Sequence, residues 1–340
     1  MRPGPARAGS ARRAHRRRAA GAALAAALVA AAACGGGDHE AAGDDRPAPT
    51  TAPSTAAPET AAPDTAAPET AAPAPPPPVD VATLRPPPPV ADPGALAARI
   101  AAAEATLRSG TGSEADIAGA ALAQQAAYRQ LGDHPEWDEA VVAAVPAEVG
   151  PAVRSHAAAR REFRALAGAP TDMMPAWNIV APAPADQLVA WYQEAEADFG
   201  VPWQVLASVN LVETGLGRIR GTSVAGAQGP MQFLPSTWAA YGEGDINDHR
   251  QAIRAAARYL AANGAPGDLD GALWNYNHSD HYVRGVRIYA DLIAEHPGAF
   301  AGFHHWGVWY TTVAGDLYLP VGYAATERVP VDQYLASAPG

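Results

Sequence analysis

The chain has 340 residues, a formal net charge of −11 and one cysteine, Cys34. A single cysteine excludes an internal disulfide, and removal of the seven arginines in the first 18 residues takes the net charge to −18. That negative charge argues against a nucleic-acid partner and against electrostatic binding to an anionic membrane.

The N-terminus has the composition of an export signal. An arginine-rich start without acids is followed by an Ala/Leu/Val run over residues 19–33, which is shorter than the ~20 residues that span a bilayer. We therefore expect residues 1–33 to be a signal peptide. Residues 28–35 resemble a lipoprotein processing site, which implies lipidation of Cys34 and attachment to the outer face of the cell membrane. Cleavage with free secretion is the alternative.

Residues 34–93 are rich in Pro, Ala and Thr, with a five-residue echo that begins at Thr55, Thr60 and Thr65. No unit of this echo offers an apolar face that could stack, so the composition predicts a disordered tether and not a repeat fold. A Pro-rich tether would let a membrane-anchored domain work in the cell wall above it. A glycosylated or merely protective spacer is the alternative.

The remaining chain predicts a mainly α fold. Residues 94–170 have apolar residues at helical spacing but little bulk, which predicts an accessory helical segment that packs on the following domain. Residues 171–300 predict a compact helical domain, with helices over 186–198, 202–215, 235–241, 248–263, 269–276 and 279–295, and with Ser279 as a capping residue. Residues 301–340 predict a C-terminal β extension, with a short hairpin that turns at Gly315 and Asp316.

Glu213 is the only acid between residues 201 and 215. Its helical neighbours Asn210 and Val209 make a largely apolar flank, so its carboxyl would be poorly solvated. Desolvation and the negative end of the helix dipole both push the pKa of Glu213 upward, which suits a general acid. A glutamate in the last turn that swings into solvent is the alternative.

Three motifs follow one another in the chain: Glu-Thr-Gly at residues 213–215, Gly-Pro-Met-Gln-Phe at residues 229–233, and Asn-Tyr-Asn-His-Ser at residues 275–279. In this order they resemble the lytic transglycosylase superfamily, which has a lysozyme-like fold. The resemblance covers about residues 186–292. It implies an enzyme that cleaves the MurNAc-GlcNAc β-1,4 bond of peptidoglycan and leaves a 1,6-anhydromuramoyl end.

The resemblance also implies roles for single residues. Glu213 would be the catalytic acid and base. Gln232, Tyr276 and Asn277 would line the sugar cleft, with Glu213 as the expected partner of the Tyr276 hydroxyl, and Ser223 would add a hydroxyl contact. The same resemblance implies glycan strands as the substrate, with proteins of wall synthesis or division as further candidate partners, and no cofactor.

Other interpretations stay open at this stage. A muramidase would use the same Glu213 with water as nucleophile, with an Asp or Glu from residues 243–248 as a possible second carboxylate. A non-catalytic wall-binding module would keep the cleft for recognition. Histidines at 278, 281, 304 and 305 lack carboxylate or Cys partners at recognisable ligand spacing, so no metal is expected.

Overall fold

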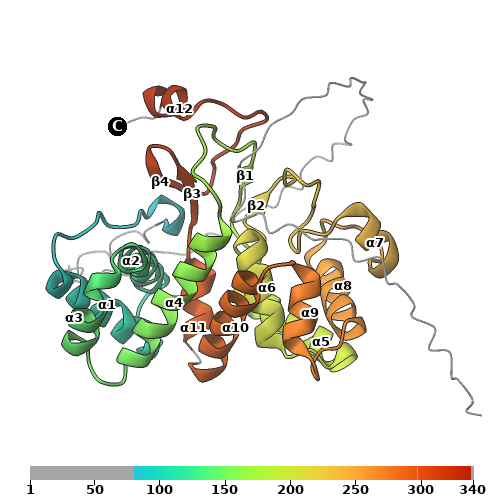
Figure 1. The fold of residues 1–340 in the computed structure, drawn as a ribbon, viewed down its shortest axis with the longest axis horizontal. Helices are drawn as coiled ribbons and strands as arrows, with labels where there is room; N and C mark the ends of the chain where they lie inside the picture. Colours follow the sequence, from blue (N-terminus) through green and yellow to red (C-terminus); the bar gives the residue numbers. More distant parts are fainter. Residues whose placement is uncertain (1–79, 297, 338–340) are drawn as a thin grey trace, which may run out of the picture.

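The structure, a computed structural model, describes residues 80–296 and 298–337. In this range the protein is mainly helical with a small antiparallel hairpin near the C-terminus, which confirms the coarse prediction (Figure 1). Among the described residues, no helix combines the length and apolar character that crossing a bilayer requires. The predicted signal peptide, Cys34 and the tether as far as residue 79 lie outside the described residues.

The helices are α1 (Pro93–Ser109), α2 (Glu114–Asp133), α3 (Asp138–Ala144), α4 (Gly150–Leu166), α5 (Ala185–Phe199), α6 (Trp203–Thr214), α7 (Pro235–Tyr241), α8 (His249–Ala262), α9 (Leu269–Tyr276), α10 (Asp280–Glu295), α11 (Ala299–His305) and α12 (Val331–Ser337). Short 3-10 helices occupy Val81–Thr83 and Pro135–Trp137. The strands are β1 (Asn178–Ile179), β2 (Ile219–Arg220), β3 (Val308–Thr312) and β4 (Gly315–Leu319).

The last part of the expected tether, residues 80–92, packs against the first helices. The Val90 amide donates to the side-chain carbonyl of Gln130 at 3.0 Å, and the Gln130 amide returns a bond to the Val90 carbonyl at 2.7 Å. Arg99 donates to the Pro88 carbonyl at 2.6 Å. The packed part of the chain therefore begins about a dozen residues earlier than its Pro-rich composition indicated.

Helices α1 to α4 form a hydrophobic cluster of their own, which the alanine-rich sequence did not lead us to expect. Its bulk comes from a few large side chains, among them Leu96, Ile100, Tyr128 and Leu131. Alanine contributes in a different way, because a methyl side chain lets neighbouring helices approach closely. Helix α2 also begins with a reciprocal capping box between Ser113 and Asp116, which stabilises its first turn.

Helices α5 to α10 belong to the largest hydrophobic cluster, and capping or terminating residues fix several of their ends. Gly200 and Gly215 adopt the left-handed conformation directly after α5 and α6, where a side chain would be strained. Asp248 caps α8 by accepting a bond from the Gln251 amide. Ser279 does occupy the N-cap position of α10, but its side chain makes no capping hydrogen bond, so that detail of the prediction was wrong.

Helix α10 lies between the two groups of helices and contacts α4 on one side and α6 on the other (Figure 1). The contact with α4 is close at Gly285, where an added Cβ would lie 2.5 Å from the Phe163 ring. On the other side, the Ser208 hydroxyl of α6 donates to the Val286 carbonyl at 2.7 Å. Helix α10 thus joins the accessory helices to the later ones, and α11 adds contacts with α1 and α2.

The C-terminal residues contain more than the predicted hairpin. Helix α11 puts Phe300 and Phe303 into the main cluster. The strands β3 and β4 pair so that Thr312 lies opposite Gly315, which places the turn at Val313 and Ala314, two residues before the predicted Gly315-Asp316 turn. A third cluster under the hairpin joins it to β1, β2 and α12. The β1–β2 ladder and α12 were not anticipated from the sequence.

Candidate functional site

Glu213 lies in the last turn of α6, and its side chain is completely buried, with 0% of its surface exposed. The residues of α6 around it, Val209 and Asn210 among them, are buried as well. From α10, the Tyr282 hydroxyl donates a hydrogen bond of 2.8 Å to Glu213 Oε1. The alternative of a glutamate that swings into solvent is therefore wrong.

Tyr276 and Tyr282 form a stacked pair beside Glu213. Both are fully buried, and their rings are 6.3 Å apart between centroids with an interplanar angle of 4°. Burial, with the nearby Glu213 carboxyl as the second cause, raises the pKa of both phenols well above their usual value of 10. Each phenol is thus a neutral donor with a single proton across the physiological pH range.

The Tyr276 hydroxyl donates its hydrogen bond to the Met231 carbonyl oxygen, at 2.7 Å. The expected hydrogen bond from Tyr276 to Glu213 is thus replaced by the bond from Tyr282, which the sequence analysis did not single out. Tyr276 still belongs to the site, because it links α9 to the loop that follows α6. The sequence of α10 does not mark Tyr282 by itself, because Tyr289 on the same helix is a second buried tyrosine.

The loop over residues 228–233 has a strained and closely packed backbone. Gln228 and Phe233 exchange two backbone hydrogen bonds of 2.9 Å. Gly229 has φ of +74°, and an added Cβ would lie 2.0 Å from the Ile246 carbonyl oxygen, so only glycine fits. Gln232 has φ of +50°, which is uncommon for a residue with a side chain and is often found at functional sites.

Gln232 is almost completely buried, with 1% of its surface exposed. Its amide nitrogen donates to the Gly229 carbonyl at 3.0 Å. Its amide oxygen, Oε1, is buried and has no hydrogen-bond partner among the described residues. A buried acceptor without a partner is costly, so this oxygen is suited to a donor from a ligand. Met231 and Phe233, on either side, are core residues.

Helix α6 holds this loop by one carbonyl group. Asn210 and Thr214 both donate to the Pro230 carbonyl oxygen, at 2.8 and 2.6 Å. Asn210 is fixed in turn by the Tyr192 hydroxyl, which donates to its side-chain oxygen at 2.6 Å. The three sequence motifs therefore meet: the turn with Glu213 binds the loop, and the loop binds Tyr276. Asn210 and Tyr192 were missed because nothing local in the sequence marks them.

Two further predicted residues have mainly local contacts. Asn277 is 8% exposed and ends α9, where its backbone amide donates to the Leu273 carbonyl at 3.0 Å. Ser223 is half-buried, and its hydroxyl oxygen accepts a bond from the Ala227 amide at 3.0 Å. Asn277 is next to Tyr276 in the chain and so lies near the site. The hydrogen bonds described for Ser223 only shape the turn that precedes the loop.

The acids considered as a second carboxylate have other partners. Glu243 is largely exposed and pairs with Arg258 at 2.9 Å. Asp245 accepts a bond from the Asn247 amide at 2.9 Å, and Asp248 is the cap of α8. None of these contacts involves Glu213. In the part of the chain that the structure describes, no group of three or more His, Cys, Asp and Glu side chains has the arrangement of a metal site.

Comparison with protein-family models, with curated proteins and with solved structures finds no match for this chain. The assignment of a function therefore depends on the geometry around Glu213. That geometry consists of a buried carboxyl with a phenol donor, an inward-facing amide at a strained backbone position, and a loop tied to two helices.

Proposed function

We propose that this protein is a peptidoglycan lytic transglycosylase, with helices α5 to α10 as a lysozyme-like catalytic domain and Glu213 as its acid and base. The observation that carries the proposal is the burial of Glu213 beside the Tyr282 hydroxyl, at the point where three motifs of that superfamily meet. The resemblance of the three motifs to that superfamily indicates peptidoglycan strands as the substrate class. The buried carboxyl supports the chemistry.

Burial disfavours the charged form of a carboxyl, while the Tyr282 hydroxyl stabilises the carboxylate by donating to it. A group under these two opposed influences can serve in both protonation states, as the reaction requires. The acid first protonates the glycosidic oxygen, and the bond from that oxygen to the anomeric carbon of N-acetylmuramic acid breaks. The C6 hydroxyl oxygen then bonds to the anomeric carbon while the Glu213 carboxylate takes the hydroxyl proton. No water is consumed.

This route needs one carboxyl, because the substrate supplies the nucleophile, whereas most glycosidases use a flanking pair. The partners of Glu243, Asp245 and Asp248 agree with a single-acid site. Gln232 is suited to orienting the N-acetyl group through its buried amide oxygen. Because Glu213 is fully covered, a bound strand has to displace the side chains that cover it.

The test is mass spectrometry of muropeptides released from purified peptidoglycan by the full chain and by Glu213→Gln. We expect 1,6-anhydromuramoyl products from the parent and a loss of at least about a hundredfold in the variant, since acid–base catalysis supplies roughly 10²–10⁴-fold. The amide can still accept the Tyr282 bond, so glycan binding and thermal stability should remain close to those of the parent.

Other products would change the assignment. Muramic ends that borohydride can reduce would identify a muramidase that uses water. Unchanged activity in Glu213→Gln would remove Glu213 from the mechanism. Binding of glycan without any product from the parent would favour a recognition module.

We further propose that the protein is exported and anchored at the outer face of the membrane through lipidated Cys34, with peptidoglycan strands as its substrate. The arginine-rich start, the short apolar run and the small residues before Cys34 support this location. The mass of the N-terminal peptide from the native membrane fraction tests it. A diacylglyceryl cysteine is expected, and a mature N-terminus that lacks a modified Cys34 would contradict the anchor.

A further inference from the structure

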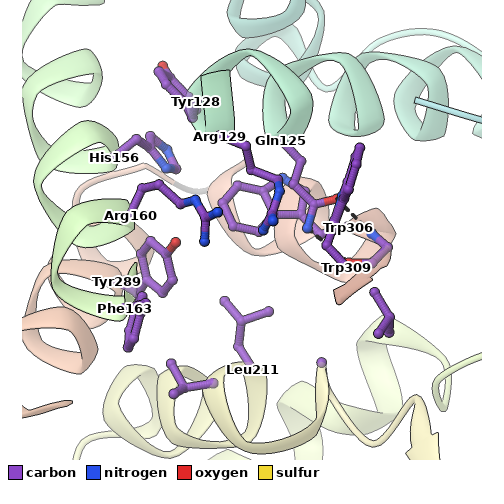
Figure 2. A pocket seen from close by; sticks show the side chains of 14 residues that line it. Gln125, Tyr128, Arg129, His156, Arg160, Phe163, Leu211, Tyr289, Trp306 and Trp309 are labelled. Carbon is purple, nitrogen blue, oxygen red and sulfur yellow. Dashed lines mark hydrogen bonds between the residues drawn. The ribbon is translucent and has the colours of Figure 1, made fainter. Parts of the chain in front are cut away.

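A cavity of about 110 Å³ lies between the accessory helices and α6. None of its lining residues belongs to the loop over residues 228–233. Helices α2, α4 and α10 and the start of β3 form its walls, and α6 contributes Leu211 and Val212 (Figure 2). Aromatic rings make up much of the lining, with Trp306, Trp309 and Tyr289 among them. The cavity has no role in the mechanism proposed above.

One wall of the cavity is held rigidly by Gln125. The Gln125 amide donates to the Gly307 carbonyl at 2.9 Å, and its oxygen accepts from the Gly307 amide at 3.0 Å. The same oxygen accepts a bond from the Trp309 indole at 3.1 Å, and the Trp306 indole donates to Gln124 at 3.0 Å. Both indole N–H groups are therefore occupied, and their rings present apolar faces.

Two guanidinium groups also line the cavity, that of Arg129 beside Gln125 and that of Arg160 from α4 (Figure 2). Both pair with Asp316, Arg160 at 2.9 Å, and Arg164 adds a third contact to the same carboxylate at 3.4 Å. None of the fourteen residues that line the cavity, all within the described part of the chain, is acidic. The cavity thus has two cations on its surface, while the nearby carboxylates, Asp316 and the more distant Asp133, lie outside its lining.

Both guanidinium groups are largely buried. Burial, followed by repulsion from Arg160, lowers the pKa of Arg129 to about 9, and burial also lowers the pKa of Arg160. Arg160 Nε and His156 Nδ1 are buried and have no hydrogen-bond partner among the described residues. The Arg160 Nε–H is therefore a buried donor without a partner among the described residues, and an anionic acceptor suits it.

The position of Arg160 is fixed by the helix packing. An added Cβ at Gly132 of α2 would lie 2.4 Å from Arg160 Cγ, so the absence of a side chain at Gly132 allows the arginine stem to cross α2. Arg129 is held against the Trp309 ring, with its guanidinium carbon 4.8 Å from the ring centroid. Neither cation is free to leave the cavity for solvent without disturbing a helix contact.

We propose that this cavity binds a small monocarboxylate, with the carboxylate on Arg160 and Arg129 and the short apolar body against the Trp306 and Trp309 rings. A cavity of about 150 Å³ holds a benzene ring, so the present one suits about four to six non-hydrogen atoms. Acetate and propionate are in this range. These carboxylates also bring a methyl or ethyl group to the apolar indole faces, which inorganic phosphate lacks.

The experiment measures thermal unfolding of the full chain against concentration of acetate or propionate, with chloride replaced so that ionic strength stays constant. Acetamide is the neutral probe of the same shape, and phosphate is the tetrahedral one. A saturable rise in Tm with the two carboxylates alone is expected, because a ligand that binds only the folded state stabilises it. Arg160→Gln should weaken the apparent affinity at least tenfold.

The matched control is Arg164→Gln, because Arg164 is also on α4 and also contacts Asp316 but does not line the cavity. It should keep the response of the parent. Arg129→Gln serves as the second cavity variant if Arg160→Gln does not fold. An equal response to acetate and acetamide, an equal response to phosphate, or a full acetate response in the cavity variants would overturn the proposal.

Discussion

Tyr282 of α10 donates its only hydroxyl proton to Oε1 of Glu213 on α6, across a buried contact of 2.8 Å between residues 69 positions apart. Both side chains are completely buried. The neighbouring Tyr276 directs its hydroxyl to the loop backbone instead. The two stacked phenols therefore have separate tasks: one positions the carboxyl and the other positions the loop.

This division of tasks predicts different effects for two similar substitutions. Tyr282→Phe removes the donor to Glu213 and should destabilise the fold by about 1–3 kcal/mol, the usual cost of an unpaired buried partner. It should also move the alkaline limb of the pH–rate profile to higher pH, because Glu213 has to begin the reaction protonated and its carboxylate form loses a donor. Denaturant unfolding and the pH dependence of glycan cleavage measure the two effects.

Tyr276→Phe is the matched control, because it loses the bond to the Met231 carbonyl and should cost a similar amount of stability. Its pH–rate profile should resemble that of the parent in shape. The same displacement of the profile in both variants would show that Tyr282 acts only through general packing.

Gly229 and Gly226 offer a second matched pair. Both have left-handed backbones, with φ of +74° and +84°, but only Gly229 faces a neighbour, the Ile246 carbonyl. Gly226→Ala should cost about 1 kcal/mol from conformation alone. Gly229→Ala should cost that amount plus the clash, in total about 3 kcal/mol or more. Urea unfolding compares them, and equal losses would mean that the contact with Ile246 is easily relaxed.

The buried His156 predicts a loss of stability in acid. Burial lowers the pKa of His156 from its ordinary value of 6.5 to about 4. Below pH 6.5 the unfolded chain takes up a proton at this imidazole while the folded chain does not, so stability present at neutral pH is lost as the pH falls toward 4. The contribution is roughly 3 kcal/mol at most, from 1.36 kcal/mol per pKa unit.

His156→Phe keeps an aromatic ring in the stack with Tyr128, whose centroid is 4.1 Å away, and removes the titrating group. Its unfolding free energy should fall by about 2–3 kcal/mol less than that of the parent between pH 7 and pH 4. Urea titrations at the two pH values measure the difference. Parallel losses in the two proteins would exclude His156 as a source of the acid sensitivity.

The features that the sequence predicted well are those with local causes. Gly200, Gly215 and Asp248 mark helix ends because left-handed glycines and capping carboxylates act within a few residues. The burial of Glu213 followed from its neighbours on its own helix. The inward turn of Gln232 agreed with the glycine and proline that precede it.

The features that were missed depend on packing between distant segments. Tyr282 reaches Glu213 only because α10 lies against α6, and Asn210 reaches the Pro230 carbonyl only because the loop folds back. The spacing of residues along one helix predicts neither of these two contacts. The hairpin turn was placed two residues late because Gly315 is a strong turn former, yet it pairs with Thr312 as the first residue of β4.

The close approach of Gly285 to the Phe163 ring has a consequence for inheritance. Helix α10 presents Tyr282 to Glu213 and, one turn later, presents a residue without a side chain to α4. A gene rearrangement that replaced the first four helices by an unrelated module would have to recreate a surface that fits this notch. Helices α4 and α10 are therefore matched to each other at this contact, and a change in one calls for a compensating change in the other.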